Sequence, residues 1–85
     1  MTLFRAEIKI KLKKGVADPE GANTKKALEM LGFKGVSEVK SVKTFELVIS
    51  AQDRLKAQDS LDQMCRRLLA NPVIHNYVIS IEKSV

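Results

Sequence analysis

Apolar and polar side chains alternate along residues 3–13. The side chains on the apolar side are Phe4, Ala6, Ile8, Ile10 and Leu12. Successive side chains of a strand point to opposite faces, so this alternation predicts a strand with one face buried. Lys14 and Gly15 end the pattern.

A helix start follows at Asp18 and Pro19. The Asp18 side chain can accept a hydrogen bond from a free N–H of the first turn, and proline loses nothing at the first helical position. Gly32 suits the left-handed residue that ends a helix, so the helix is predicted at about 19–31. Phe33, beyond it, is placed to pack back on the last turn. The apolar face of this helix consists of Thr24, Ala27, Leu28 and Leu31.

Residues 36–50 have strand character with an interruption at Lys43. Phe45, Leu47 and Ile49 share one face. The interruption at 41–43 has no Gly, Asn, Asp or Pro, which favours one long strand with a bend or bulge over a hairpin. Such a strand would reach roughly 45–50 Å, which is long for a small domain. We therefore expect part of it to pair with, or pack on, another chain.

A second helix is predicted to start at Ser50 and Asp53, in a loose relative of the capping box. It ends at Asn71 and Pro72, because asparagine tolerates the left-handed conformation and proline cannot continue a helix. A last strand follows at about 73–82. The apolar stripe of the second helix consists of Ala57, Leu61, Met64, Cys65 and Leu68. The last strand presents Tyr77, Ile79 and Ile81 on one face.

The order of these elements predicts an α+β fold, β-α-β-α-β, in one domain spanning residues 1–85. Two helices on one face of an antiparallel sheet would bury every apolar stripe. This arrangement is a relative of the ferredoxin-like fold. If residues 36–50 formed a hairpin instead, the order would be the full ferredoxin-like one.

Composition narrows the class of protein. The chain has 85 residues, 45% of them hydrophobic, which is enough for one core. The net charge is +5, but the lysines are spread from Lys9 to Lys83 and aromatic residues make up only 5%. A solvated basic surface is therefore favoured over a nucleic-acid partner. We find no apolar run of the roughly 20 residues that span a bilayer, and no signal peptide, so no membrane partner and a cytoplasmic location are expected.

Candidate chemistry is sparse. His75 is the only histidine, and no neighbour in the sequence would orient it as a base. Cys65 lies on an apolar stripe, where a thiol is usually inert. One cysteine and one histidine cannot complete a zinc site in a single chain. Lys13 and Lys14 lead into a helix start that could attract phosphate, but P-loop spacing is missing and Asp18 would compete with an anion. We expect no catalytic, metal-binding or cofactor-binding residue in this chain.

Three stretches together resemble one known family. They are LKKGVADPEG at 12–21, ALEMLGFKGV at 27–36 and CRRLLANPVIHNY at 65–77. In order and spacing they resemble the PurS family, the small subunit of phosphoribosylformylglycinamidine synthase. The resemblance covers about residues 4–82.

This resemblance implies a non-catalytic role in de novo purine biosynthesis. In the family, a glutaminase subunit releases ammonia, and a large synthetase subunit, where ATP and magnesium are expected, uses it to make the amidine. The small subunit forms a homodimer or tetramer, bridges the other two and assists ammonia transfer. The segments Asp18, Pro19, Glu20, Gly21 and Asn71, Pro72 become candidates for interface or architectural roles. The interpretation of these two segments as a helix start and a helix stop is at least as well supported as an interface role.

Two other functions compete with this interpretation. Small dimeric α+β modules often bind regulatory small molecules between subunits, but the sequence shows no clear polar pocket. RNA binding across an open sheet would need aromatic residues on that face. Phe45 and Tyr77 fall on the faces assigned to the core.

Overall fold

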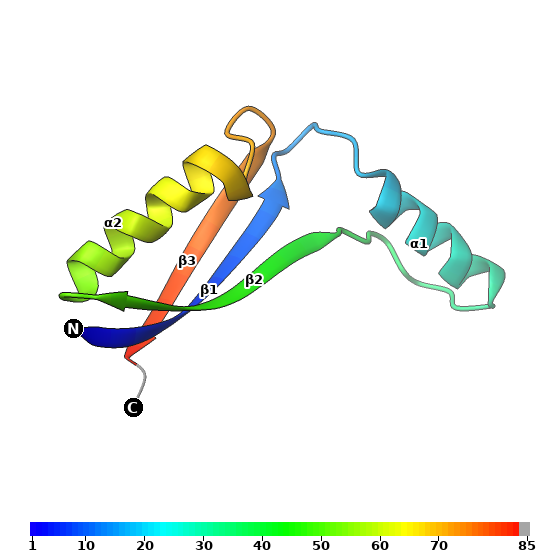
Figure 1. Ribbon diagram of the computed structural model, residues 1–85. Helices are drawn as coiled ribbons and strands as arrows, with labels where there is room; N and C mark the ends of the chain where they lie inside the picture. Colours follow the sequence, from blue (N-terminus) through cyan, green and yellow to red (C-terminus); the bar gives the residue numbers. More distant parts are fainter. Residues whose placement is uncertain (84–85) are drawn as a thin grey trace.

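The computed structural model describes residues 1–83. Its elements are β1 (Thr2–Leu12), α1 (Pro19–Met30), β2 (Val42–Ala51), α2 (Arg54–Met64), the π-helical turn η1 (Cys65–Leu69) and β3 (His75–Lys83). The strands form one antiparallel sheet in the order β2-β1-β3 (Figure 1). The predicted α+β class and the β-α-β-α-β order are confirmed.

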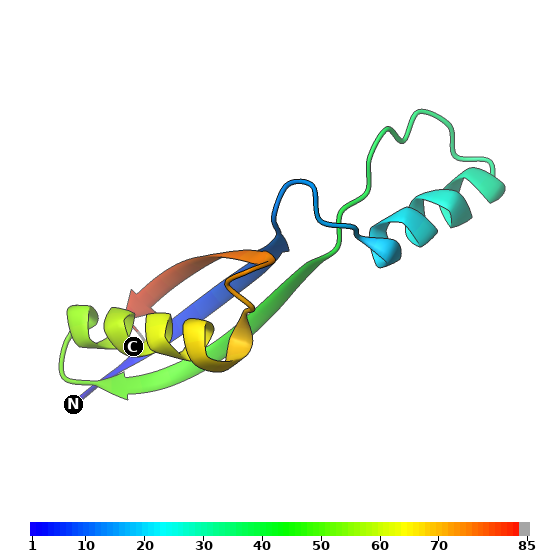
Figure 2. The same cartoon turned by 90° about the horizontal axis from the view of Figure 1, so that it is seen from above.

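The first strand is the centre of the sheet and of the core. Ile8 is fully buried and lies opposite Phe45 of β2 and Ile79 of β3. The helix α2 lies along one face of the sheet (Figure 2), and strand alternation directs the inward side chains of all three strands to that face. The buried residues of the core are Phe4, Ala6, Ile8, Ile10, Ala51, Ala57, Leu61, Cys65, Ala70 and Ile81.

The second helix covers one face of this sheet. Ala57 and Leu61 are fully buried. The helix is capped by Asp53, whose carboxylate accepts a hydrogen bond from the Lys56 N–H at 2.9 Å. Ser50 lies within β2, so the predicted role of Ser50 in the helix start is wrong: pairing with β1 continues through Ala51 and leaves Asp53 as the first free cap.

The π-helical turn changes which leucine faces the core. The Ala70 N–H donates to the Cys65 carbonyl oxygen, five residues back, at 2.9 Å. The extra residue in this turn leaves Leu68 83% exposed and brings Leu69 against the core. The predicted place of Leu68 on the buried stripe is therefore wrong, because that stripe assumed regular α-helical spacing.

The helical path ends earlier than the sequence predicted. Ala70 is already extended, at φ −128° and ψ 150°. Within residues 1–83 only glycines have positive φ, so Asn71 is not the left-handed stop. Its carbonyl oxygen instead accepts hydrogen bonds from the Ile74 and His75 N–H groups and closes the loop into β3.

The largest difference from expectation concerns α1, which does not cover the sheet. Together with its flanking segments it projects beyond the strand ends (Figures 1 and 2); we call residues 14–41 the arm. The predicted long strand over 36–50 is correct only from Val42 onward. The reason is that β1 ends at Leu12, so the residues before Val42 have no strand to pair with and run beside α1 instead.

The ends of α1 itself agree with the sequence. Asp18 is the N-cap and Pro19 is the first helical residue. Gly32 has φ +93°, and the N–H groups of Gly32 and Phe33 donate to the carbonyl oxygens of Glu29 and Leu28, which is the Schellman arrangement.

Candidate docking surface

The arm is tied to the sheet end by one carboxylate. Asp18 accepts hydrogen bonds from the Gly21 N–H at 2.9 Å, the Ser41 N–H at 2.8 Å and the Ser41 hydroxyl at 2.7 Å. The Ser41 N–H, then the Gly21 N–H and the Ser41 hydroxyl, lower the pKa of Asp18, because each donor favours the charged carboxylate. One side chain thus caps α1 and holds the start of β2 against it.

The close packing of the arm depends on Gly21, the only buried residue of α1. A Cβ built there would collide with the Val39 carbonyl oxygen and lie 2.8 Å from Asp18 Oδ2. The segment before β2 therefore runs directly against the first turn of the helix. The sequence signalled Gly21 only as part of a family motif, and its structural reason appears only once Val39 is in place.

The segment around Asn71 and Pro72 lies at the same end of the sheet. Lys13 Nζ donates to the Pro72 carbonyl oxygen at 2.7 Å, and the Lys13 N–H donates to the Ile74 carbonyl oxygen at 2.8 Å. The two predicted segments thus flank one end of the molecule. The groove between them has a volume of about 490 Å³ and is lined by Ile10, Leu12, Glu20, Ser41, Val42, Lys43, Leu69 and His75.

Of the six predicted residues, Glu20 lines this groove directly. Asp18 and Gly21 shape the arm, and Pro19 starts α1. Asn71 stabilises the loop: its N–H donates to His75 Nδ1 at 2.9 Å, and its side-chain oxygen accepts from the Val73 N–H at 3.0 Å. Their architectural roles are visible, whereas their contact with a partner stays a prediction.

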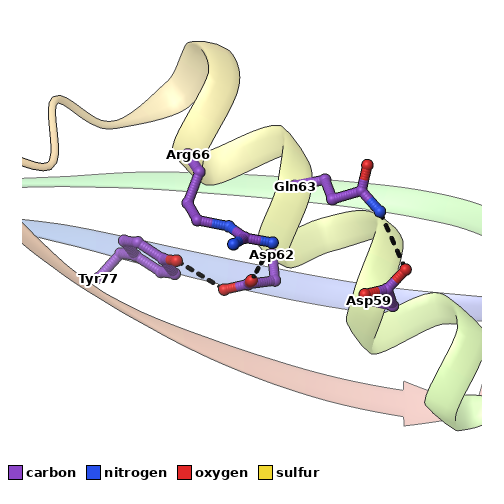
Figure 3. A network of polar contacts seen from close by, with 5 residues as sticks. All are labelled: Asp59, Asp62, Gln63, Arg66 and Tyr77. Atoms are coloured by element: carbon purple, nitrogen blue, oxygen red, sulfur yellow. Dashed lines mark hydrogen bonds and ion pairs between the residues drawn. The ribbon is translucent and has the colours of Figure 1, made fainter.

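The side chains with potential chemistry serve the fold. Cys65 is fully buried, and burial, followed by the negative charge of Asp62, raises the pKa of its thiol. Asp62 accepts a hydrogen bond from the Tyr77 hydroxyl at 2.6 Å and pairs with Arg66 at 2.9 Å (Figure 3). The bond to Asp62, and then burial, raise the pKa of Tyr77. This network fastens α2 to β3. The raised pKa of the thiol, due first to burial, favours its protonated form, which disfavours nucleophilic chemistry.

Metal-binding clusters and membrane-spanning helices are both absent from the part of the chain that the structure describes. Residues 1–83 contain no cluster of three or more His, Cys, Asp or Glu side chains able to hold a metal ion. No helix within the same residues is both long and apolar enough to cross a bilayer.

The sheet face opposite α2 is mixed in character. Leu3, Val48 and Val78 are more than half exposed there, between charged side chains. Glu7 lies directly opposite Glu46 in the β1–β2 pairing, an unfavourable like-charge pair. Phe45 and Tyr77 pack on the other face, against the core, as predicted. They are therefore unavailable for stacking bases on the open face.

A second groove lies between α2 and β2, and sequence reasoning missed it. Its volume is about 450 Å³, and it is lined by Leu47, Ser60, Gln63, Met64, Arg67, Leu68 and Leu69; we call it the α2 groove. The turn η1 supplies two of its leucines. Only knowledge of the π-helical turn would have placed Leu68 at its rim, and the sequence carried no signal for that turn.

Comparison with known proteins gives a consistent result. The family model for PurS, described as phosphoribosylformylglycinamidine (FGAM) synthase, matches residues 5–83. The PurS subunit of Methanocaldococcus jannaschii is 43% identical over 95% of this chain and 98% of its own length. The PurS subunit of Archaeoglobus fulgidus is 53% identical over 87% of this chain and 92% of its own.

Solved structures agree in shape as well. The crystal structure of M. jannaschii PurS, one of the subunits of formylglycinamide ribonucleotide amidotransferase, aligns with a TM-score of 0.86 and 44% identity over 96% of this chain and 99% of that one. A chain in the structure of PurLQS from Thermotoga maritima aligns with a TM-score of 0.84 and 26% identity over 99% and 100%. Such coverage includes the arm, so its projection from the sheet is shared. On the family match and these identities, the chain belongs to the PurS family.

Proposed function

We propose that this chain is the non-catalytic small subunit of phosphoribosylformylglycinamidine synthase, acting in de novo purine biosynthesis. In this role it associates with itself, bridges the glutaminase and synthetase subunits, and assists the transfer of ammonia between them. The observation that carries the proposal is the match of the PurS family over residues 5–83, with relatives that the chain covers almost completely.

The side chains support an accessory role. The thiol is buried, the histidine accepts a hydrogen bond from the Asn71 N–H, and the hydrogen bond from Tyr77 to Asp62 fastens helix to strand. The main features of the exposed surface are the projecting arm, the groove at its base and the second groove beside α2. Such surfaces suit contact with large partners better than turnover of a small substrate.

The physical case for a bridging subunit rests on the chemistry of ammonia. Ammonia released into neutral water is protonated, and ammonium has no lone pair with which to attack an activated carbon. A protected passage between the glutaminase and synthetase sites avoids this loss. In the proposed assembly the small subunit fixes the positions of the other two subunits relative to each other. ATP and magnesium bind to the synthetase, and this chain contributes no reacting group.

The test is reconstitution with the synthetase and glutaminase subunits of the same organism. Conversion of formylglycinamide ribonucleotide is measured with glutamine, and separately with ammonia, in the presence and absence of this chain. We expect the chain to restore glutamine-driven turnover and to change ammonia-driven turnover little. Equal glutamine-driven turnover without the chain would refute the proposal and favour a dimeric small-molecule-binding module instead.

The groove at the base of the arm can be probed in the same assay. Glu20→Lys reverses the charge of an exposed side chain in that groove, and Glu29→Lys makes the same change elsewhere on α1 as a matched control. If the predicted interface includes Glu20, only the first variant should require a higher concentration of this chain for half-maximal glutamine-driven turnover.

A further inference from the structure

The sheet face opposite α2, which we call the open face, carries its charges in a defined order. Helix α2 lies on the other side of the sheet, and the arm projects past the strand ends (Figures 1 and 2). Side chains alternate along β1, so its odd-numbered residues point away from the core and toward the open face. Along this strand the face is acidic at Glu7 and basic at Lys9 and Lys11. The charge therefore changes sign toward the arm.

The acidic part is a hollow of about 410 Å³, in which three carboxylates lie near the single guanidinium of Arg5. The carboxylates belong to Glu7, Glu46 and Glu82. Glu7 and Glu46 are direct cross-strand neighbours, an arrangement that destabilises the sheet because like charges repel. Lys9 approaches Glu7 at 3.6 Å, but the ion pairs within residues 1–83 include none to Glu46. A cation supplied from outside the chain would relieve this repulsion.

The basic part is a second hollow, between the turn after β1 and the segment before β2. Its volume is about 640 Å³, and its lining includes Lys11, Lys13, Lys14 and Lys40. The two carboxylates of this hollow are already engaged. Asp18 accepts its three hydrogen bonds from Gly21 and Ser41, and Glu38 pairs with Lys40 at 3.5 Å. The hollow thus keeps an excess of positive charge.

Exposed apolar side chains lie among these charges. Val48 and Val78 are each 58% exposed, and Leu3 is 51% exposed. Val48 is two residues from Glu46 on the same face of β2, and Val78 lies opposite Lys9 in the pairing of β1 with β3. Apolar and charged side chains mixed in this way are the ordinary composition of a contact between separately folded proteins.

Two other classes of ligand do not match the pattern. Glu7 and Lys11 are about 13 Å apart along β1, so a phosphate ion or an amino acid would not reach both hollows. Asp18 already occupies the N-terminus of α1, where a small anion would otherwise bind. Nucleic acid has a uniformly negative backbone, which the carboxylates of Glu7 and Glu46 would repel. A protein surface can present both signs, since about nine residues of a helix span this distance.

We propose that the open face docks another subunit of the complex, through a protein surface with the reverse order of charges. A lysine or arginine flanked by apolar side chains lies over Glu7 and Glu46, and carboxylates face the four lysines of the second hollow. This pattern fixes the orientation of the partner, because a partner turned end for end would bring like charges together. The inference rests on the proposed function and deepens it by assigning a surface to a partner subunit.

Glu46→Lys is the decisive variant, because folding and docking predict opposite effects. In the isolated chain it places a lysine opposite Glu7, so the melting temperature should rise by about 2–5 °C. In reconstitution with the synthetase and glutaminase subunits, the concentration of this chain for half-maximal glutamine-driven turnover should rise at least about tenfold. Glu29→Lys makes the same charge change at an exposed position on α1, and should leave that concentration unchanged.

Lys11→Glu tests the basic end of the pattern. It should raise the same half-maximal concentration at least about tenfold, whereas Lys56→Glu, the same charge change at an exposed position on α2, should not. Sedimentation of Glu46→Lys and Lys11→Glu should give the wild-type mass, because the open face meets a different protein. Circular dichroism verifies that the variants are folded.

The outcomes separate this inference from the proposed function. If the wild type restores turnover and either Glu46→Lys or Lys11→Glu has an unchanged half-maximal concentration, the docking surface is refuted and the proposed function stands. If the wild type restores no turnover, both are refuted. A changed mass for either variant would assign the open face to a second copy of the chain. Salt-sensitive binding of a single-stranded RNA oligonucleotide that Lys11→Glu abolishes would assign it to nucleic acid. Either result would overturn the proposal.

Discussion

Replacement of Gly21 by alanine tests whether the arm is a packed unit. In an exposed helix, alanine is more stable than glycine by about 1 kcal/mol, so an unpacked α1 would become more stable. In this structure the new Cβ meets a backbone carbonyl oxygen, that of Val39, and lies 2.8 Å from Asp18 Oδ2. Neither atom can move without releasing the contacts between α1 and the segment that leads into β2.

The expected result therefore has the opposite sign to helix propensity. Overpacking against a fixed neighbour costs about 1–3 kcal/mol, which leaves a net loss of about 1 kcal/mol for the arm after the gain in propensity. The most direct probe is amide hydrogen exchange at Ser41, whose N–H donates to Asp18. A loss of this size accelerates exchange there several-fold to about tenfold. Exchange at the buried Ile8 in β1 should stay unchanged.

Asn23→Ala is the matched control for this experiment. Asn23 is exposed two residues further along α1, so the same alanine is introduced without a collision. It should slow exchange at Ser41 slightly or leave it unchanged. If Gly21→Ala also slows exchange at Ser41, the first turn of α1 is not packed against the Val39 carbonyl oxygen as described.

Three further predictions follow from the contacts of single side chains. Tyr77 is the only tyrosine, so its ionisation can be followed by ultraviolet absorbance, and we expect a pKa above 10.0 that falls toward the ordinary value in Asp62→Asn. The pKa of Asp18 is depressed in the folded chain, so the stability it contributes should be present above the ordinary pKa of 3.8 and be lost as the pH falls through the lower folded value. Acid titration of wild type against Asp18→Asn, monitored by circular dichroism, checks this, and identical profiles would contradict it. Leu61→Ala should cost about 2–5 kcal/mol in urea unfolding, whereas Leu68→Ala in a monomeric background should change stability by less than about 0.5 kcal/mol.

The sequence predicted those features that depend on neighbouring residues. Alternation along residues 3–13 identified the central strand and its buried face. The chemistry of Asp18, Pro19 and Gly32 identified both ends of α1, because caps are decided within one or two turns of the helix.

The features that the sequence did not predict depend on distant contacts. An amphipathic stripe shows that a helix has an apolar face, but it does not show which surface covers that face, so α1 was placed on its own sheet. The strand over 36–50 was predicted too long because its partner β1 ends at Leu12. The α2 groove was missed for the same reason, since it exists only where α1 is absent and where η1 turns Leu68 outward.

The number of residues in the turn η1, and not their type, decides which of its two leucines is exposed to solvent. Leu68 and Leu69 are chemically identical neighbours, and their opposite environments result from one residue accommodated between Cys65 and Ala70. Deletion of one residue from this turn would allow regular α-helical hydrogen bonding and rotate the leucines that follow it by about 100° around the helix axis. An insertion or deletion at this point would therefore alter the surface of the α2 groove even if every leucine were retained.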